Sequence, residues 1–123
     1  MRLTEVTYGT AKAVEGYGPG YFRVAGHVLR GPCLITPWDA GPWGGYDDTV
    51  APLSLLGQID VLFVGTGASI AHVPPAFREA LEGQGIGVEV MSSPTAARTY
   101  NVRLGEGRRV AVALLPVEGP QNS

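Results

Sequence analysis

The sequence predicts an α/β fold, in which a single compact domain has a three-layer β/β/α arrangement and a mixed sheet that contains a βαβ unit. The first observation behind this prediction is the continuous apolar run at residues 59–64, which is typical of a strand buried on both faces of a sheet. The second is the short amphipathic helix and the apolar strand that follow it, at residues 74–83 and 86–91. The third is another β-branched, apolar strand at residues 109–115.

The length of the chain sets its organisation. At 123 residues the chain has the size of one ordinary domain, so we expect one hydrophobic core within a domain that covers residues 1–123. Residues 1–10 and 117–123 are expected to fray. Glycine (18) and proline (10) are abundant, but a hydrophobic content of 45% argues against disorder. Tight turns between short strands explain this composition.

The N-terminal half is predicted to hold short strands and loops. Residues 2–8 alternate loosely and predict an edge strand, and residues 16–20 (GYGPG) predict a turn. Residues 21–30 have strand spacing, with Gly26 placed for a bulge or a tight turn. A short apolar strand at 33–36 leads into an aromatic loop at 37–46, and one irregular helical turn is expected within 47–56.

Two helices are predicted in the C-terminal half. Phe77, Ala80 and Leu81 fall at i, i+3 and i+4, and Gly83 stands where a C′ glycine would end that helix. The second helix is expected to begin with Ser93 as N-cap and Pro94 as its first residue, and to end at Gly105 or Gly107. Ala96 and Ala97 are small enough for this helix to lie close to a sheet.

Charge and composition argue against several classes of function. The net charge is −2 and the nine Lys and Arg residues are spread thinly, so we expect no nucleic-acid partner. No apolar run approaches the ~20 residues that span a bilayer, so we expect no direct membrane insertion. The N-terminus lacks the apolar segment of a secretory leader, which predicts a cytoplasmic location.

Metal and cofactor binding are not predicted either. Cys33 is the one cysteine, and it lies in an apolar strand where a thiol is usually inert. His27 and His72 lack the short helical spacing of a zinc pair. The sequence also contains no complete nucleophile and base arrangement, so no catalytic residues are assigned, and a non-catalytic protein is favoured over an enzyme without the question being decided.

One candidate ligand site combines a glycine turn with polar side chains of the second predicted helix. The turn follows the buried strand and would lie at the carboxyl edge of the sheet, where open backbone N–H groups can meet an anion. Arg98 and Asn101 share one helix face, with Glu106 and Arg108 folding back near them. An arginine fork, an amide and a carboxylate can bind a carboxylate or phosphate, but a packing turn and an internal ion pair fit the same residues. The candidate residues are Gly65, Thr66, Gly67, Arg98, Asn101, Glu106 and Arg108.

A second candidate is the aromatic loop that contains Trp38, Trp43 and Tyr46. Exposed tryptophans and tyrosines often anchor protein interfaces, so the loop predicts a surface that contacts a protein partner. The same loop can instead fold back as a lid over the sheet. The sequence does not decide between these two arrangements.

Residues 17–116 resemble the family known as domain of unknown function 498, which includes mitochondrial complex I (NADH dehydrogenase) assembly factor 3. The resemblance depends on the order and spacing of short motifs, above all the Arg98–Thr–Tyr–Asn101 segment, with Glu106–Gly–Arg108 and the strand that ends at Leu115–Pro116. Further matches are Phe22 with Gly26, Pro37–Trp38, Val64–Gly–Thr–Gly67 and Gly85–Ile–Gly–Val–Glu89. Ala97 stands where the family pattern often has a cysteine, directly before Arg98.

The resemblance implies a three-layer β/β/α fold and, by similarity to the mitochondrial member, an assembly role that depends on binding other proteins. We therefore expect a small cytoplasmic, non-catalytic protein-binding or assembly module with a protein partner. The alternative is a small-molecule (anion)-binding protein or enzyme that uses a pocket near Gly65–Gly67 and Arg98/Asn101.

Overall fold

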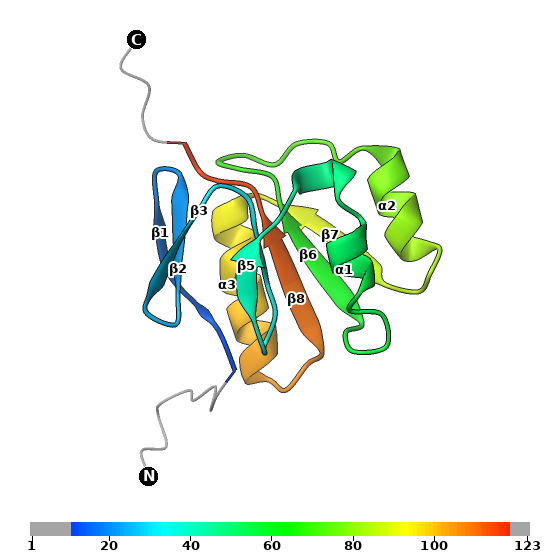
Figure 1. The fold of residues 1–123 in the computed structure, drawn as a ribbon, viewed down its shortest axis with the longest axis horizontal. Helices are drawn as coiled ribbons and strands as arrows, with labels where there is room; N and C mark the ends of the chain where they lie inside the picture. Colours follow the sequence, from blue (N-terminus) through cyan, green and yellow to red (C-terminus); the bar gives the residue numbers. More distant parts are fainter. Residues whose placement is uncertain (1–10, 119–123) are drawn as a thin grey trace.

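A computed structural model describes residues 11–118, which form a mixed α/β structure with two sheets and three α-helices (Figure 1). A three-stranded sheet is built from β1 (Val14–Gly18), β2 (Tyr21–Val24) and β3 (His27–Arg30). The larger sheet contains β4 (Cys33–Ile35), β5 (Ala40–Pro42), β6 (Val61–Gly65), β7 (Gly87–Met91) and β8 (Val110–Leu114). The helices are α1 (Val50–Leu53), α2 (Pro75–Glu82) and α3 (Ser93–Gly105), and a 3₁₀ turn covers Gly45–Asp47.

The five strands of the larger sheet lie in the order β5-β4-β8-β6-β7. β6 is parallel to both β7 and β8, whereas β4 is antiparallel to β8 and to β5. The chain passes from β6 through α2 to β7, and from β7 through α3 to β8. The predicted α/β class, the mixed sheet and its βαβ unit are therefore confirmed, and β7 is one free edge of the sheet.

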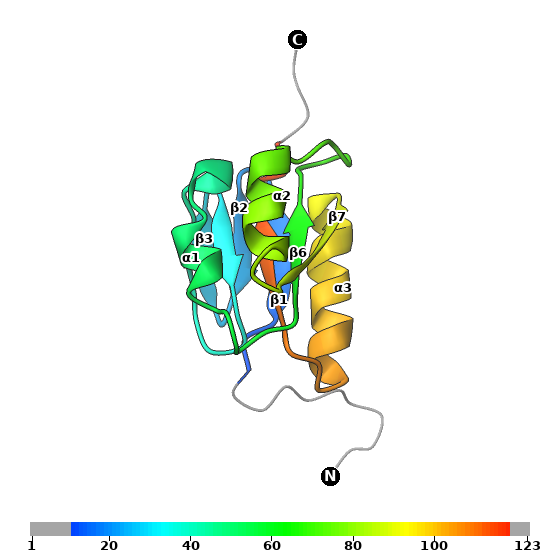
Figure 2. The ribbon, with the colours of Figure 1, turned by 90° about the vertical axis from the view of Figure 1, so that its right-hand side faces the viewer.

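The larger sheet is buried on both faces, as its apolar strands predict. In β8 the side chains alternate: Val110, Val112 and Leu114 belong to one core cluster, and Ala111 and Ala113 belong to the other. The first cluster joins the sheet to α3 and to the three-stranded sheet, and the second joins it to α2 and the α1 segment. The predicted three layers are present, with α3 beside the small sheet and α1 and α2 on the opposite face (Figure 2).

The segment before the larger sheet differs from the sequence prediction. Residues 14–18 form β1, because their backbone pairs with β2 across a bulge between Val14 and Gly16. The turn predicted at 16–20 is therefore present but limited to Pro19–Gly20. The predicted strand at 21–30 is a hairpin of β2 and β3. Ala25 (φ 52°) and Gly26 (φ 78°) are both left-handed, as a tight two-residue hairpin turn requires. Gly26 thus supplies the tight turn that the sequence left as one of two options.

The predicted aromatic loop at 37–46 contains a strand and part of a 3₁₀ turn, which its composition does not indicate. Residues 40–42 pair with β4 as the edge strand β5, and a 3₁₀ turn follows at Gly45–Asp47. Pro42 ends β5, which is consistent with the confinement of proline to edge positions of sheets. This pairing sets the direction of the chain as it leaves β5, and Trp43 is the next residue after this strand.

The two helices after β6 form where predicted, but their end residues shift. The N-cap of α3 is Ser92, whose Oγ accepts the Thr95 N–H at 3.4 Å, so Ser93 is already helical and Pro94 is the second helical residue. At the end of α2 the left-handed glycine is Gly85 (φ 102°) rather than Gly83. The Ile86 N–H returns to the Leu81 carbonyl at 3.1 Å, which completes a Schellman motif between two buried apolar residues.

The edge strand expected at residues 2–8 lies outside the described residues, as do most of the ends that were expected to fray. Among residues 11–118, no α-helix has the length and apolar character needed to cross a bilayer.

Candidate functional site

The glycine turn after β6 is a close-packed junction between β6, β8 and the start of α3. A Cβ on Gly65 would lie 2.7 Å from Ser93 Cα and 2.8 Å from a methyl carbon of Leu114. Gly67 adopts φ 105°, and its N–H donates to Ser93 Oγ at 2.8 Å. The same Oγ donates to the Leu115 carbonyl at 2.6 Å. Ser93 is fully buried, and its hydroxyl is the hydrogen-bond partner of both of these backbone groups.

Thr66, the middle residue of the turn, organises the loop that follows. Its Oγ1 donates to the Ser69 carbonyl at 2.7 Å and accepts the Ala71 N–H at 3.0 Å. Its own N–H donates to the Met91 carbonyl at 2.9 Å, which ties the loop to β7. The turn therefore joins strands and shapes the loop at residues 66–74, and its polar groups are engaged internally.

The structure does not bring the four predicted polar residues of the C-terminal segment together at this turn. Arg98 is exposed and donates to Thr95 Oγ1 at 3.2 Å on its own helix. Glu106 pairs with Arg103 at 3.1 Å, and Arg108 is exposed beyond the helix end. Asn101 lies eight residues after Ser93, about 12 Å along the helix axis. The predicted anion site at Gly65–Gly67 with Arg98 and Asn101 is therefore not assembled.

Asn101 instead connects α3 to β1. Its Oδ1 accepts the Val14 N–H at 2.8 Å, and its Nδ2 donates to the Val14 carbonyl at 2.8 Å. The residue directly before it, Tyr100, is buried, and its hydroxyl donates to the Lys12 carbonyl at 2.6 Å. Burial raises the pKa of this phenol. These two side chains attach the small sheet to the helix.

We expect Asn101→Leu to lower the free energy of unfolding by about 2 kcal/mol, because it leaves both polar groups of Val14 without their partners. Urea unfolding followed by circular dichroism measures this change. Arg98→Gln, on an exposed position of the same helix, is the control and should stay within about 0.5 kcal/mol. Equal stability of the two variants would show that the amide does not hold β1.

The three aromatic residues of the second candidate separate into two environments. Trp43 is buried, with 4% of its surface exposed, and its Nε1–H donates to the Asp48 carbonyl at 3.0 Å. Its ring contacts those of Tyr46 and Phe77 at centroid distances of 5.8 and 5.7 Å. Tyr46 is half-buried, which raises the pKa of its hydroxyl. Trp38 is 54% exposed, on the rim of a hollow of about 240 Å³ between β5 and α1.

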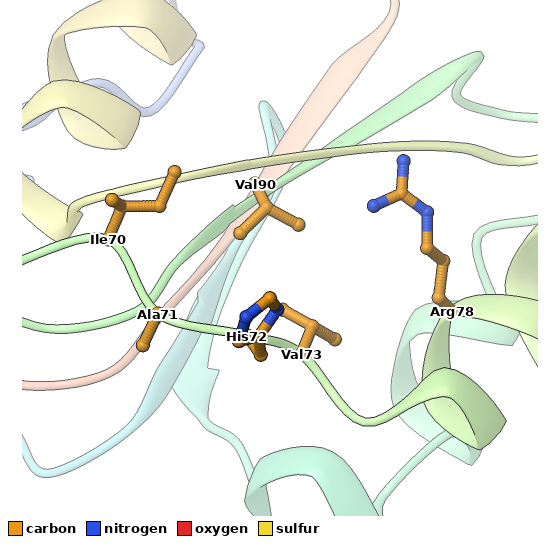
Figure 3. Close-up of a pocket in the computed structure, with 6 residues that line it drawn as sticks. All are labelled: Ile70, Ala71, His72, Val73, Arg78 and Val90. Atoms are coloured by element: carbon orange, nitrogen blue, oxygen red, sulfur yellow. The ribbon is translucent and has the colours of Figure 1, made fainter.

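A pocket that the sequence does not indicate lies between β7, the loop at residues 66–74 and the Arg78 side chain of α2 (Figure 3). Its volume is about 400 Å³, and apolar side chains surround one arginine and one histidine. The lining residues are Ile70, Ala71, His72, Val73, Arg78 and Val90. The sequence does not identify Arg78 as a pocket residue, because its spacing of four residues from Glu82 indicates only an ion pair on the helix surface. The structure contains this ion pair as well, at 3.0 Å.

Cys33 and the two histidines are the further candidates for nucleophilic or metal chemistry that the sequence analysis named. Burial raises the pKa of the Cys33 thiol to about 12, so the thiolate needed for nucleophilic attack is disfavoured at neutral pH. No group of three or more His, Cys, Asp or Glu residues within 11–118 is arranged to hold a metal ion. His27 and His72 line different pockets.

Comparisons with known proteins agree over nearly the whole chain. Residues 14–115 match the family model described as a protein of unknown function (DUF498/DUF598). An uncharacterised protein of Rhodobacter capsulatus is 50% identical over 97% of this chain and 96% of that protein. NADH dehydrogenase [ubiquinone] 1 alpha subcomplex assembly factor 3 of Danio rerio is 36% identical over 91% of this chain and 67% of its own length. A solved Mth938-like domain from Bordetella pertussis superposes with a TM-score of 0.76 at 28% identity, covering 97% of this chain and 94% of that one.

Proposed function

Because the chain belongs to the DUF498/DUF598 family, some of whose members are named as complex I assembly factors, we propose that it is a non-catalytic protein-binding or assembly module. Similarity over most of both chains supports this proposal. The family model itself matches residues 14–115, a range that includes all the described strands and helices. The partner is a protein, and the cytoplasmic location predicted from the sequence is part of the same proposal.

The observation that carries the proposal is the exposure of Trp38. A tryptophan with 54% of its surface exposed leaves a large apolar area in water, and such residues anchor protein interfaces. Its side chain stands beside a hollow that offers a receptor for a partner side chain, between Pro42 on one side and Ala51 of α1 and Leu55 of the turn after α1 on the other. The backbone around Trp38 is fixed, because its N–H and that of Asp39 both donate to Thr36 Oγ1 at 3.1 and 2.9 Å. A fixed backbone lowers the entropic cost of presenting this side chain.

The hydrogen bonds made by three polar side chains of α3 also support a binding role over a catalytic one. The Ser93 hydroxyl, the Tyr100 hydroxyl and the Asn101 amide bond to backbone groups that hold the fold together. In each case the side chain is committed to a structural contact rather than presented to a substrate.

We expect Trp38→Ala to lose a co-purifying protein when the tagged chain is isolated at its natural level from its own organism and quantified by mass spectrometry. The loss should be at least about tenfold, because truncated anchor residues cost about 2 kcal/mol or more. Tyr17→Ala is the matched control, since Tyr17 is also an exposed aromatic (46%) but lies on the small sheet. A partner retained by Trp38→Ala, or lost equally from both variants, would count against this surface.

A further inference from the structure

The pocket beside β7 has features of a ligand site that are independent of the protein-binding proposal. It lies at the carboxyl end of the parallel strands, where loops after the strands gather in α/β folds. Thr66 holds the loop that forms one wall of the pocket, through its hydrogen bonds to Ser69 and Ala71. Its volume of about 400 Å³ suits a small organic molecule.

The free edge of β7 adds backbone groups to this pocket. The Gly87 N–H donates to Asp60, and the Met91 carbonyl accepts from Thr66, so the polar groups of residues 87, 89 and 91 point toward β6. Since successive residues of a strand point their peptide groups to alternate sides, those of Val88 and Val90 point to the free edge. Val90 also lines the pocket, and its outward N–H donates to no acceptor among residues 11–118.

Arg78 is held in place at one side of this space. Its Nη2 donates to the Val88 carbonyl at 3.1 Å, and its Nε donates to Glu82 at 3.0 Å. Figure 3 shows its side chain extending from α2 toward β7, and Val90 and His72 are among the other residues that line the pocket. A guanidinium carries five N–H groups, so donors remain for a ligand. The Val88 carbonyl, an edge acceptor, is already used by Arg78 itself.

The charges around the pocket are few. Glu82 is the acidic partner of Arg78, and it is 42% exposed at the side chain. Glu89 belongs to β7, but its side chain is on the opposite face of the sheet from Val88 and Val90, because side chains alternate along a strand. The pocket therefore combines an apolar surface, formed by Ile70, Val73 and Val90, with the hydrogen-bond donors of Arg78 and His72.

We propose that this pocket binds a carboxylate carried on a short apolar body. The carboxylate accepts hydrogen bonds from Arg78 and His72, and the apolar body packs against Ile70, Val73 and Val90. Two sources supply this chemistry: a free small aliphatic acid, or the C-terminal residue of a peptide. A peptide would also pair its backbone with the outward groups of Val90, as an extended segment does when it adds to a sheet edge.

Amide chemical shifts of ¹⁵N-labelled protein test this with three probes: 4-methylpentanoate, N-acetyl-leucine and N-acetyl-leucinamide. Both acids should shift the amide signals of Val73, Arg78 and Val90 with a Kd of about 1 mM, a value typical of ligands this small. The neutral amide should bind at least about tenfold more weakly, because it lacks the charge that strengthens the bond to arginine. Tighter binding of N-acetyl-leucine than of 4-methylpentanoate indicates the peptide source, and equal binding indicates the free acid.

Variants at the rim keep this test independent of folding. Ile70 is 67% exposed, so Ile70→Glu and Ile70→Lys should both fold, and they lose the same apolar contact. Ile70→Lys should therefore bind the acids at least about fivefold more tightly than Ile70→Glu, because the two variants differ only in the charge that they place at the rim. Arg78→Gln should abolish binding, while Arg98→Gln on α3 should leave it unchanged. Shifts absent from the pocket residues, or equal affinities in the two Ile70 variants, would overturn the proposal.

Discussion

Trp43→Ala should lower the free energy of unfolding by about 3–5 kcal/mol, the range for truncating a buried aromatic residue. The substitution removes a ring that is 4% exposed and contacts both Tyr46 and Phe77. It also removes the donor to the Asp48 carbonyl, which stabilises the 3₁₀ segment before α1. The resulting cavity would lie between the larger sheet and α2, where Ala111 and Ala113 are too small to fill it.

Trp38→Ala is the matched control, because the two tryptophans are five residues apart on the same connection. Trp38 is 54% exposed and should change stability by no more than about 0.5 kcal/mol. Urea unfolding, followed by tryptophan fluorescence and by circular dichroism, measures both variants. A small loss in Trp43→Ala would mean that the loop is not part of the core. The same result would remove the reason for assigning partner contact to Trp38 alone.

Gly65→Ala should lower the free energy of unfolding by about 3 kcal/mol, at the upper end of the usual cost of overpacking. The new methyl group would meet the Cα of Ser93 at 2.7 Å and Leu114 at 2.8 Å. The first of these is a backbone atom, so α3 must move away from β6 to make room. That movement would also strain the Ser93 hydroxyl bonds to Gly67 and Leu115.

Gly41→Ala is the control for Gly65→Ala, since a Cβ at this position of β5 meets nothing within 4 Å. It should be neutral or slightly stabilising, because alanine restricts the unfolded chain more than glycine does. Thermal unfolding of the two variants, compared with the unchanged chain, gives the difference. If Gly65→Ala unfolds at the same temperature as Gly41→Ala, β6 and α3 are not in close contact at this turn. A ligand role for the glycine turn would then deserve a new test.

The sequence predicted an element correctly where the signal for that element lies within the element itself, and it failed where a distant segment decides the structure. The strand at 59–64 and that at 109–115 were predicted because both faces of each are apolar, and both occur as β6 and β8. β1 was missed because Gly16 and Gly18 read as turn residues, whereas pairing with β2 holds them extended. Gly85 replaced Gly83 at the end of α2 because the left-handed residue is selected by the return of Ile86 to Leu81.

The candidate sites were less predictable than the strands. Trp38 and Trp43 have the same chemistry and nearly the same neighbours in the sequence, yet one is exposed and one is buried. The pairing of β5 with β4 decides this, and loop composition does not reveal it. Arg78 and Val90 meet at one pocket because α2 packs beside β7, although the helix ion pair with Glu82 is all that spacing indicates.

The sequence by itself determined the α/β class, the positions of the buried strands along the chain and the family, since apolar periodicity and motif order are properties of the chain alone. The tertiary structure decided what the polar residues do. Asn101 and Ser93 read as candidates for a ligand site and a helix cap, but each bonds to backbone from a distant segment. Buried peptide groups must find partners wherever packing places them, so the roles of these side chains depend on contacts that linear spacing does not contain.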